Sequence, residues 1–316
     1  MRTKNINSAF RGRPPKFLAY QTKFGRLFHG KAEKVLKSPY FRSLVGQIQL
    51  IFTSPPFPLR RKKRYGNLVG AEYAAWLSSF APLFRDLLRD DGSIVIELGN
   101  AWEPGQPTMS TLPLRSLMDF QEAGGFFLCQ EIIWHNPARL PTPAQWVTIE
   151  RVRLKDSHTR FWWLSKVARP KADNRRVLQP YSPAMKRLLE RRTYNAGRRP
   201  SEHRIGEQSF LAHRGGSIPP SVLTVSNTSP NDPYQEFCRT HGFALHPARM
   251  PSAIAEFFIK FLTDEGDIVL DPFCGSNTTG YVAERLGRRW LGIEANEEYI
   301  RGSEGWFRDR KKQTAA

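Results

Sequence analysis

Residues 268–280 constrain the fold of this 316-residue chain more than any other segment. Apolar residues lead into an Asp-Pro pair, then a short loop with Gly275, and then threonines, which predicts a buried strand, a tight turn and the start of a helix. Such a junction directs backbone N–H groups at a ligand. Asn277 stands where a second glycine is common, and asparagine also tolerates a positive φ. The segment therefore predicts an open α/β sheet with a ligand site at one strand end.

The rest of the sheet is predicted from apolar periodicity. Strands are expected over residues 47–52, 93–98, 126–135, 159–165, 267–270 and 290–293. Helices are expected over 71–89, 252–263, 278–286 and 297–310, with a turn at Asp91-Gly92 after the first of these. Trp162 and Trp163 are interpreted as core residues.

Residues 166–245 differ in composition, because arginine, proline, serine, asparagine and histidine replace the long apolar runs. We expect a loop-rich inserted lobe here, with Tyr181 packing inside it. Residues 1–16 are basic and contain two prolines, which predicts a flexible tail.

Glu294 follows Gly275 by nineteen positions, at the end of the next predicted strand. An acid at about this distance can accept hydrogen bonds from both hydroxyls of a ribose. A dinucleotide is the alternative ligand, but the G-x-G-x-x-G pyrophosphate fingerprint is absent, which favours an adenosine without that bridge. A second interpretation also remains open, in which the segment is only a structural strand, turn and helix whose threonines cap the helix. The candidate cofactor-binding residues are Asp271, Pro272, Phe273, Gly275, Ser276, Asn277, Thr278 and Glu294.

A second loop, Ser54-Pro55-Pro56-Phe57, follows the predicted strand 47–52. Ligands bind at the carboxyl ends of strands in open α/β sheets, so this loop is placed to act on one. The two prolines fix the backbone and remove two N–H donors, which leaves carbonyl oxygens free to accept hydrogen bonds. Phe57 can stack on an unpaired base. Taken alone, the same string is also a common loop sequence.

A net charge of +19 and a pI near 10.2 indicate a polyanionic partner, with nucleic acid ahead of an anionic membrane surface. Basic residues directly after the second loop could grip phosphates, although a charge run is often only a solvated face. This cluster comprises Arg60, Arg61, Lys62, Lys63 and Arg64. Candidates for DNA contacts in the lobe are Arg198, Arg199, His203, Arg204, His213 and Arg214.

The three cysteines, Cys129, Cys238 and Cys274, are too far apart in sequence to predict a disulfide framework or paired zinc ligands. We therefore expect no metal site and a reducing compartment. No apolar run has the length of a signal peptide core or a membrane span, so the expected location is the cytoplasm, without a membrane partner.

Taken together, the two loops resemble those of the β-group DNA amino-methyltransferases, in which the catalytic motif precedes the cofactor motif. The likeness extends through residues 58–67, 136–137, 215–220 and 246–251. One departure is Lys31 after Gly30, where the family often has Gly-Asp. The resemblance implies a Rossmann-like, S-adenosylmethionine-dependent methyltransferase sheet with circularly permuted motif order. Its implied parts are a catalytic half over 17–165, a target-recognition lobe over 166–245 and a cofactor-binding half over 246–316.

The resemblance also implies function. Serine at the first position of the catalytic motif goes with the N4 amino group of cytosine in that family, so Ser54 predicts a cytosine-N4-specific enzyme that acts on a flipped base in double-stranded DNA. Ser54, Pro55, Pro56 and Phe57 would be catalytic, and Glu97 resembles an acidic position that approaches the adenosine. The family further implies DNA modification in a type II restriction-modification system, beside a cognate restriction endonuclease. We expect a monomer.

Three alternatives remain open: N6-adenine methylation, RNA methylation, and a catalytically inactive DNA-binding protein on the same scaffold. Methylation at C5 of cytosine is disfavoured because it needs a thiolate nucleophile. None of the three cysteines follows a proline, which is the setting such enzymes use.

Overall fold

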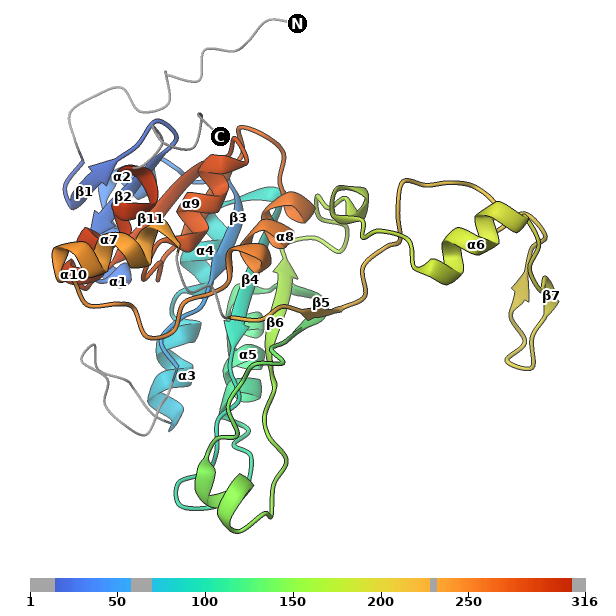
Figure 1. The fold of residues 1–316 in the computed structure, drawn as a ribbon. Coiled ribbons are helices and arrows are strands. Elements are labelled where there is room, and N and C mark those ends of the chain that lie inside the picture. The colour runs from blue at the N-terminus through green and yellow to red at the C-terminus, as the bar shows by residue number, and fades with distance from the viewer. Residues whose placement is uncertain (1–14, 58–69, 228–231, 309–316) are drawn as a thin grey trace, which may run out of the picture. The chain divides into compact units, whose positions relative to one another are not determined.

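The computed structural model describes residues 15–57, 70–227 and 232–308 (Figure 1). The chain divides into two compact units. Unit 1 comprises Met1–Ala172 and Ser221–Ala316, and unit 2 comprises Asp173–Pro220. Most of the predicted tail and the whole basic cluster, Arg60 to Arg64, lie outside the described residues.

Unit 1 is built on a nine-stranded sheet in the order β1-β2-β11-β10-β3-β4-β6-β5-β9. Five adjacent strands run parallel: β2 (Gly25–His29), β11 (Arg289–Glu294), β10 (Ile268–Asp271), β3 (Ile48–Thr53) and β4 (Leu88–Leu98). Antiparallel β1 (Leu18–Gln21) extends one edge. At the other edge β6 (His158–Ser165) is antiparallel to β4 and to β5 (Phe127–His135), and β9 (Val222–Thr224) is parallel to β5. The predicted α/β sheet is confirmed.

Strand β3 lies at the centre of the sheet, and four of its six residues are apolar, as suits a strand that is covered on both faces. All six of its residues are buried. Its neighbour β10 comes from the far end of the chain, with Leu50 opposite Val269 and Ile51 opposite Leu270. Since parallel strands end at the same edge, the loops after β3 and β10 emerge side by side.

Helices cover both faces of this sheet (Figure 1). Ile51 packs into one core cluster, whereas Leu50 and Phe52 pack into another, as alternation along a strand requires. The first cluster contains residues from α1 (Ala32–Val35), α2 (Pro39–Arg42), α3 (Gly70–Ser78), α4 (Ala81–Leu87) and α5 (Leu112–Gly124). The second contains residues from α8 (Ser252–Leu262), α9 (Thr278–Arg285) and α10 (Glu297–Ser303).

A third, small cluster joins Tyr234 and Cys238 of α7 (Pro233–His241) to Trp306 of α11 (Gly305–Arg308). Trp162 packs in the first cluster and Trp163 in the second. Each is 8% exposed, which confirms both as core residues.

The predicted helix 71–89 is wrong in its length. It is divided into α3 and α4, and Pro82 occupies the first turn of α4, where its missing N–H costs nothing. Asp91 and Gly92 form no turn between elements but lie inside β4. There the register jumps from Ile48 opposite Leu88 to Leu50 opposite Ser93. The predicted last helix is likewise two short ones, α10 and α11, separated at Glu304.

Unit 2 contains the 3-10 helix η3 (Asn174–Val177), α6 (Pro183–Arg191) and an antiparallel hairpin of β7 (Gly197–Arg198) and β8 (Arg204–Ile205). It is narrower than the predicted lobe 166–245, because β9 and α7 belong to unit 1. The Tyr181 hydroxyl accepts a hydrogen bond from the Arg214 N–H at 2.7 Å, and its ring meets His213 edge-on, so Tyr181 does pack inside this unit.

Within the described parts of the chain, we find no helix with the length and apolar character needed to span a bilayer. The same residues contain no group of three or more His, Cys, Asp or Glu side chains arranged to hold a metal ion.

Candidate active site

Asp271, the last residue of β10, connects the two loops singled out in the sequence. Its Oδ1 accepts hydrogen bonds from the Thr53 hydroxyl at 2.8 Å and the Phe273 N–H at 3.1 Å. Its Oδ2 accepts one from the Thr279 hydroxyl at 2.7 Å. Burial raises the pKa of Asp271 to about 6, against the opposing effect of these hydrogen bonds. Because Thr53 directly precedes Ser54, one buried side-chain contact holds the candidate catalytic and cofactor loops together.

The turn after β10 has the backbone that its sequence predicts. Asn277 has a φ of +57° and caps α9 by accepting a hydrogen bond from the Gly280 N–H at 3.2 Å. Gly275 has a φ of +51°, and a Cβ there would lie 2.8 Å from His246 Nε2. Glycine at 275 thus meets both a conformational and a steric requirement.

Other residues of the turn are held from both sides. Phe273 packs against Trp76 and Phe80, with ring centroids 5.5 and 5.4 Å away. The Ser276 hydroxyl lies 3.1 Å from that of Thr278. The Trp306 indole donates a hydrogen bond to the Ser276 carbonyl at 2.8 Å. Contacts within the protein alone therefore hold the turn in this conformation.

Glu294 ends β11, the neighbour of β10, and its carboxylate faces the same turn. Oε2 accepts a hydrogen bond from the Gly275 N–H at 2.9 Å, and Oε1 accepts from the N–H groups of Ala295 and Asn296 at 2.8 and 2.7 Å. Burial raises the pKa of Glu294 despite these three donors. The Gly30 N–H donates to the Glu294 carbonyl at 2.9 Å, while Lys31 serves as the N-cap residue of α1.

Glu97 lies near the end of β4, beside the catalytic loop. The register places Ile96 of β4 opposite Thr53 of β3, and Glu97 is only 8% exposed. Burial raises its pKa to about 7, opposed by the neighbouring Ser54 hydroxyl and by the charge of Arg139. The structure thus pairs Ser54 with a carboxylate, a contact that the sequence did not predict. A role of Glu97 in cofactor binding stays a prediction.

The remainder of the catalytic loop is partly enclosed. Pro55 is buried, whereas Ser54, Pro56 and Phe57 are partly exposed. Phe57 lies against Gly99, just beyond the end of β4, where a Cβ would come 3.4 Å from its ring. The aromatic ring therefore stands at the same edge as Ser54 and Glu97.

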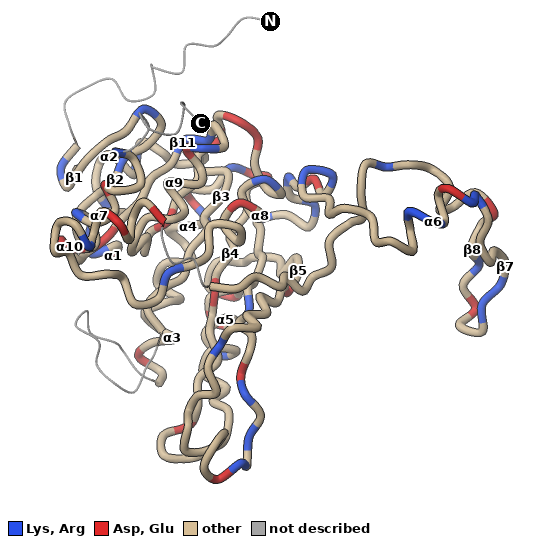
Figure 2. Tube along the Cα trace, viewed as in Figure 1, with Lys and Arg blue, Asp and Glu red and all other residues tan. Residues whose placement is uncertain are grey.

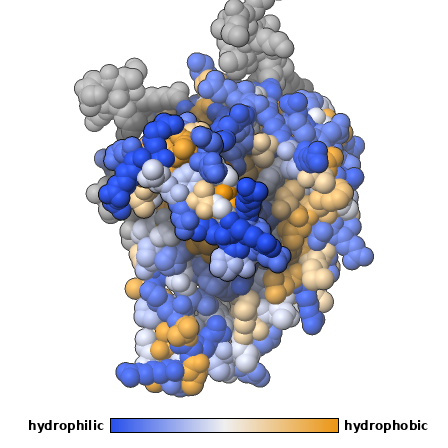
Figure 3. All heavy atoms as spheres, turned by 90° about the vertical axis from the view of Figure 1, so that its right-hand side faces the viewer, coloured by the Kyte–Doolittle hydropathy of each residue, from blue (hydrophilic) through white to orange (hydrophobic). Residues whose placement is uncertain are grey.

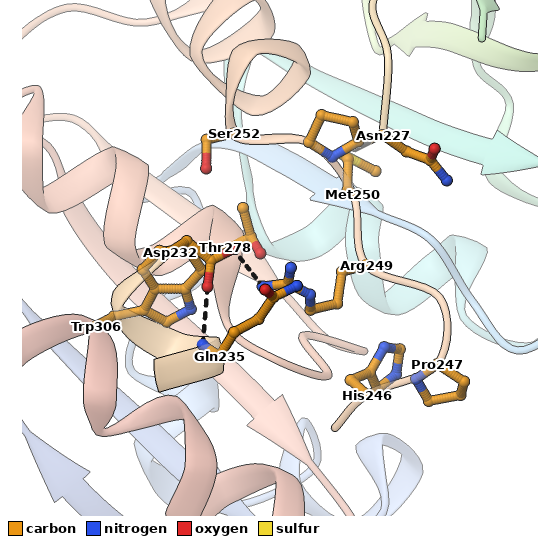
Figure 4. A pocket seen from close by; sticks show the side chains of 11 residues that line it. Asn227, Asp232, Gln235, His246, Pro247, Arg249, Met250, Ser252, Thr278 and Trp306 are labelled. Carbon is orange, nitrogen blue, oxygen red and sulfur yellow. Dashed lines mark hydrogen bonds and ion pairs between the residues drawn. The ribbon is translucent and has the colours of Figure 1, made fainter. Parts of the chain in front are cut away.

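A cavity of about 240 Å³ opens beside the turn after β10 (Figure 4). Arg249 and Asp232 form an ion pair across it at 2.6 Å, and both side chains are largely buried. Asp232 also caps α7 by accepting a hydrogen bond from the Gln235 N–H at 2.8 Å. The cavity is lined by Asn227, Asp232, Gln235, His246, Pro247, Arg249, Met250, Pro251, Ser252, Thr278 and Trp306.

This cavity contains functional groups that sequence reasoning did not assign. The segment 246–251 was singled out by its resemblance, but no residue of it was given a role. A guanidinium and a carboxylate side by side complement the carboxylate and ammonium of an amino acid. The cavity adjoins the turn, because His246 lies over Gly275 and Thr278 belongs to both.

The candidate DNA-binding residues of unit 2 gather at two places. Arg198 and Arg204 pair across the β7–β8 hairpin, with exposed His203 beside them and Arg199 donating its N–H to the His203 carbonyl at 2.8 Å. His213 and Arg214 lie with Tyr181.

Positive charge dominates the whole of unit 2, which carries ten lysine and arginine residues against four acidic ones (Figure 2). Like charges opposite each other destabilise a strand pair. Their presence across this hairpin fits a polyanionic partner, which would neutralise them.

Together, the sheet order, the joined loops and the cavity define a class of α/β protein that binds a nucleoside-containing ligand and acts on a second molecule beside it. The family model described as DNA methylase, N6_N4_Mtase, matches residues 48–305. This chain therefore belongs to the N6/N4 DNA methylase family.

Two relatives and one solved structure illustrate the range of similarity. The type II methyltransferase M.PvuII of Proteus hauseri is 43% identical over 293 residues, which cover 92% of this chain and 86% of that protein. The type II methyltransferase M.ScaI of Streptomyces caespitosus is 26% identical over 89% of this chain and 80% of its own length. The solved structure of PvuII DNA methyltransferase, described as cytosine-N4-specific, superimposes with a TM-score of 0.75 at 37% identity, over 93% of this chain and 90% of that one. The resemblance of the motifs and the predicted fold are confirmed.

Proposed function

We propose that this chain transfers a methyl group from S-adenosylmethionine to the N4 amino group of a cytosine in duplex DNA. One observation carries the proposal: the Thr53 hydroxyl binds Asp271, which sets Ser54 beside the turn that would hold the methyl donor. The identity with M.PvuII and the serine at position 54 support cytosine N4 as the acceptor.

The residues around the turn suit each part of the cofactor. Glu294 would accept hydrogen bonds from the ribose hydroxyls. The N–H groups of Phe273, Cys274 and Gly275 already donate hydrogen bonds within the protein, so the side chains carry this part of the proposal. In the adjoining cavity, Arg249 would bind the α-carboxylate and Asp232 the α-ammonium. The buried carboxylates of Asp271 and Glu294 also favour a ligand with a positive sulfonium. When bound, S-adenosylmethionine supplies an electrophilic methyl carbon whose bond to sulfur breaks as the new bond to nitrogen forms.

Ser54 and Glu97 would prepare the acceptor. The lone pair of a cytosine amine is delocalised into the ring, so the amine must become pyramidal before it can attack. The Ser54 hydroxyl and the loop carbonyls can hold its N–H protons out of the ring plane. The Glu97 carboxylate would accept a hydrogen bond from the Ser54 hydroxyl, which would keep the serine oxygen lone pairs directed at the amine. The proton released after transfer has an acceptor path through Ser54 toward Glu97.

A paired cytosine cannot reach so enclosed a site, so the target base must rotate out of the helix. Phe57 would stack on the rotated base, because its ring is partly exposed beside Gly99. Unit 2 would recognise the surrounding sequence through Arg198, Arg199, His203, Arg204, His213 and Arg214, while Arg60 to Arg64 would bind flanking phosphates. In a cell, we expect a cytoplasmic monomer that protects DNA from a cognate restriction endonuclease.

The test is methyl transfer from labelled S-adenosylmethionine to unmodified plasmid DNA, followed by mass analysis of the nucleosides. We expect N4-methylcytosine. Ser54→Ala should lower turnover at least about tenfold, because one oriented hydrogen bond in the transition state is worth more than about 1.4 kcal/mol. Its affinity for S-adenosylmethionine should stay that of the wild type.

Other outcomes of this experiment would contradict the proposal. N6-methyladenine would replace the assigned base, and DNA binding without any transfer would show a catalytically inactive scaffold. Wild-type turnover by Ser54→Ala would remove the serine from the mechanism.

A further inference from the structure

Two long loops leave the sheet of unit 1 at the edge that carries Ser54 and Glu97. Residues 99–111 follow β4, and residues 136–157 connect β5 to β6 and include the π-helix η2 (Gln145–Ile149). The Arg153 guanidinium joins them, since it donates a hydrogen bond to the Pro107 carbonyl at 2.7 Å and lies 5.5 Å from the Trp102 ring centroid. We call these two loops together the arm; they form the lower end of the ribbon in Figure 1.

The base of the arm is anchored in the active site. Asn136 is buried, and the Arg139 guanidinium donates a hydrogen bond to the His158 carbonyl at 3.0 Å while its charge acts on Glu97. The Asn100 side chain accepts a hydrogen bond from Arg160 of β6 at 2.6 Å. The arm therefore has a fixed origin beside the catalytic residues.

The outer part of the arm exposes apolar side chains to an unusual degree. Leu154 is 90% exposed, Leu140 73%, Ile149 68% and Val152 60%. Single exposed apolar residues are ordinary, but four within fifteen residues of one loop indicate a binding surface. In Figure 3, apolar and hydrophilic residues lie side by side at the lower end of the molecule.

Basic residues alternate with these apolar ones. Residues 151–155 read Arg-Val-Arg-Leu-Lys, and Arg151 and Lys155 are exposed on either side of Leu154. Residues 136–157 carry four basic residues against two acidic ones, and Asp156 already pairs with Arg153 at 3.8 Å. This combination suits duplex DNA, whose phosphates attract the charges and whose base stack accepts an apolar side chain.

A second copy of this chain is a poorer occupant. The chain carries a net charge of +19, and apposing two such arms would bring Arg151 and Lys155 of each copy together. Charge complementarity thus selects a polyanion.

We propose that the arm enters duplex DNA beside the target base and that Leu154 occupies part of the gap left when that base rotates out. This inference rests on the proposed function. Arg151 and Lys155 contact the flanking phosphates. Occupation of the gap keeps the neighbouring bases stacked against protein, and it therefore favours the extrahelical state that Ser54 requires.

The experiment compares Leu154→Ser with Met118→Ser, a matched change at a residue of α5 that is 65% exposed. The substrate is a short duplex with the site that the wild-type protein modifies, found by sequencing methylated plasmid DNA. A second duplex has the same site with the target cytosine mismatched, so that the base leaves the stack readily. We expect Leu154→Ser to lower kcat/KM at least about fivefold on the paired duplex and less than about twofold on the mismatched one. Met118→Ser should match the wild type on both.

Three results would overturn the proposal: a Leu154→Ser enzyme equal to the control, an equal loss on both duplexes, or a wild-type dimer in sedimentation that Leu154→Ser dissociates. If the wild type modifies no DNA, the proposed function fails separately. The arm is then judged by binding, because Leu154→Ser must still weaken affinity for a mixed-sequence duplex with one abasic position more than Met118→Ser does.

Discussion

Unit 1 and unit 2 are stabilised by different means. In unit 1, every residue of β3 is buried between two apolar clusters. The carboxylates of Asp271 and Glu97 are buried in the same unit. In unit 2, whose residues 173–220 are all described, no hydrophobic side chain is buried. Its contacts are hydrogen bonds and ring edges, such as Tyr194 against Phe210 at 5.4 Å. Packing therefore fixes distances where chemistry is proposed, while charge dominates where recognition is proposed.

The largest expected effect tests the packing side of this comparison. Phe258→Ala removes a fully buried ring that packs on Phe52 and Phe161, and should lower the free energy of unfolding by about 3–5 kcal/mol. Phe210→Ala in unit 2, where the ring is 44% exposed, should cost less than about 1 kcal/mol. Urea unfolding followed by tryptophan fluorescence measures the first, since all eight tryptophans lie in unit 1, and hydrogen exchange of the amides of residues 173–220 measures the second. Equal costs would show that unit 2 has a core of its own.

The second prediction tests the charge of unit 2. Replacing both Arg198 and Arg204 by alanine should weaken duplex DNA binding about ten- to thirtyfold at ~0.1 M salt, because two phosphate contacts are lost. The dependence of log K on log salt should become shallower by about 2. Fluorescence anisotropy across a salt series provides both quantities.

The control for this pair is the double variant of Arg301 and Arg308 in unit 1. These arginines are 58% and 61% exposed, but each pairs with a glutamate one helical turn away. Their removal should leave the salt dependence nearly unchanged. An equal effect of the two double variants would mean that net charge alone drives binding.

The smallest expected effect concerns the buried carboxylate beside Ser54. Because burial raises the pKa of Glu97 to about 7, the group becomes protonated as pH falls through 7 and ceases to be a pure acceptor. Between pH 7.5 and 6.5, kcat/KM should fall about threefold. Glu97→Gln should be slower than the wild type and should lack this dependence. A wild-type profile that is flat over this range would contradict the role of Glu97.

Sequence reasoning located the parts of unit 1 whose structure depends on local patterns. The strands around β3 and β10, the positive φ of Asn277 and the placement of Glu294 all follow from apolar periodicity and turn chemistry. The division of helix 71–89 was missed although Pro82 marked it, because the apolar spacing continues across the break.

Contacts between distant segments could not be read in the same way. The bond from Thr53 to Asp271 depends on strand order, and the contact of Ser54 with Glu97 depends on β4 lying next to β3. The cavity at Arg249 forms because α7 packs within unit 1. The amino-acid composition of α7 predicts instead that this helix belongs to the lobe. In unit 2 no hydrophobic side chain is buried, so the sequence carries no apolar periodicity from which the limits of this unit could be read.

The pairing of β3 with β10 has a consequence for how the protein is made. The central strand is synthesised early, but its neighbour on one side emerges only at residues 268–271. Until then a nascent chain presents an apolar strand with an unpaired edge, and long-range parallel pairing forms slowly. Activity should therefore appear only when nearly the whole chain has left the ribosome. Truncated products should aggregate rather than bind DNA unproductively, which confines methylation to completed molecules.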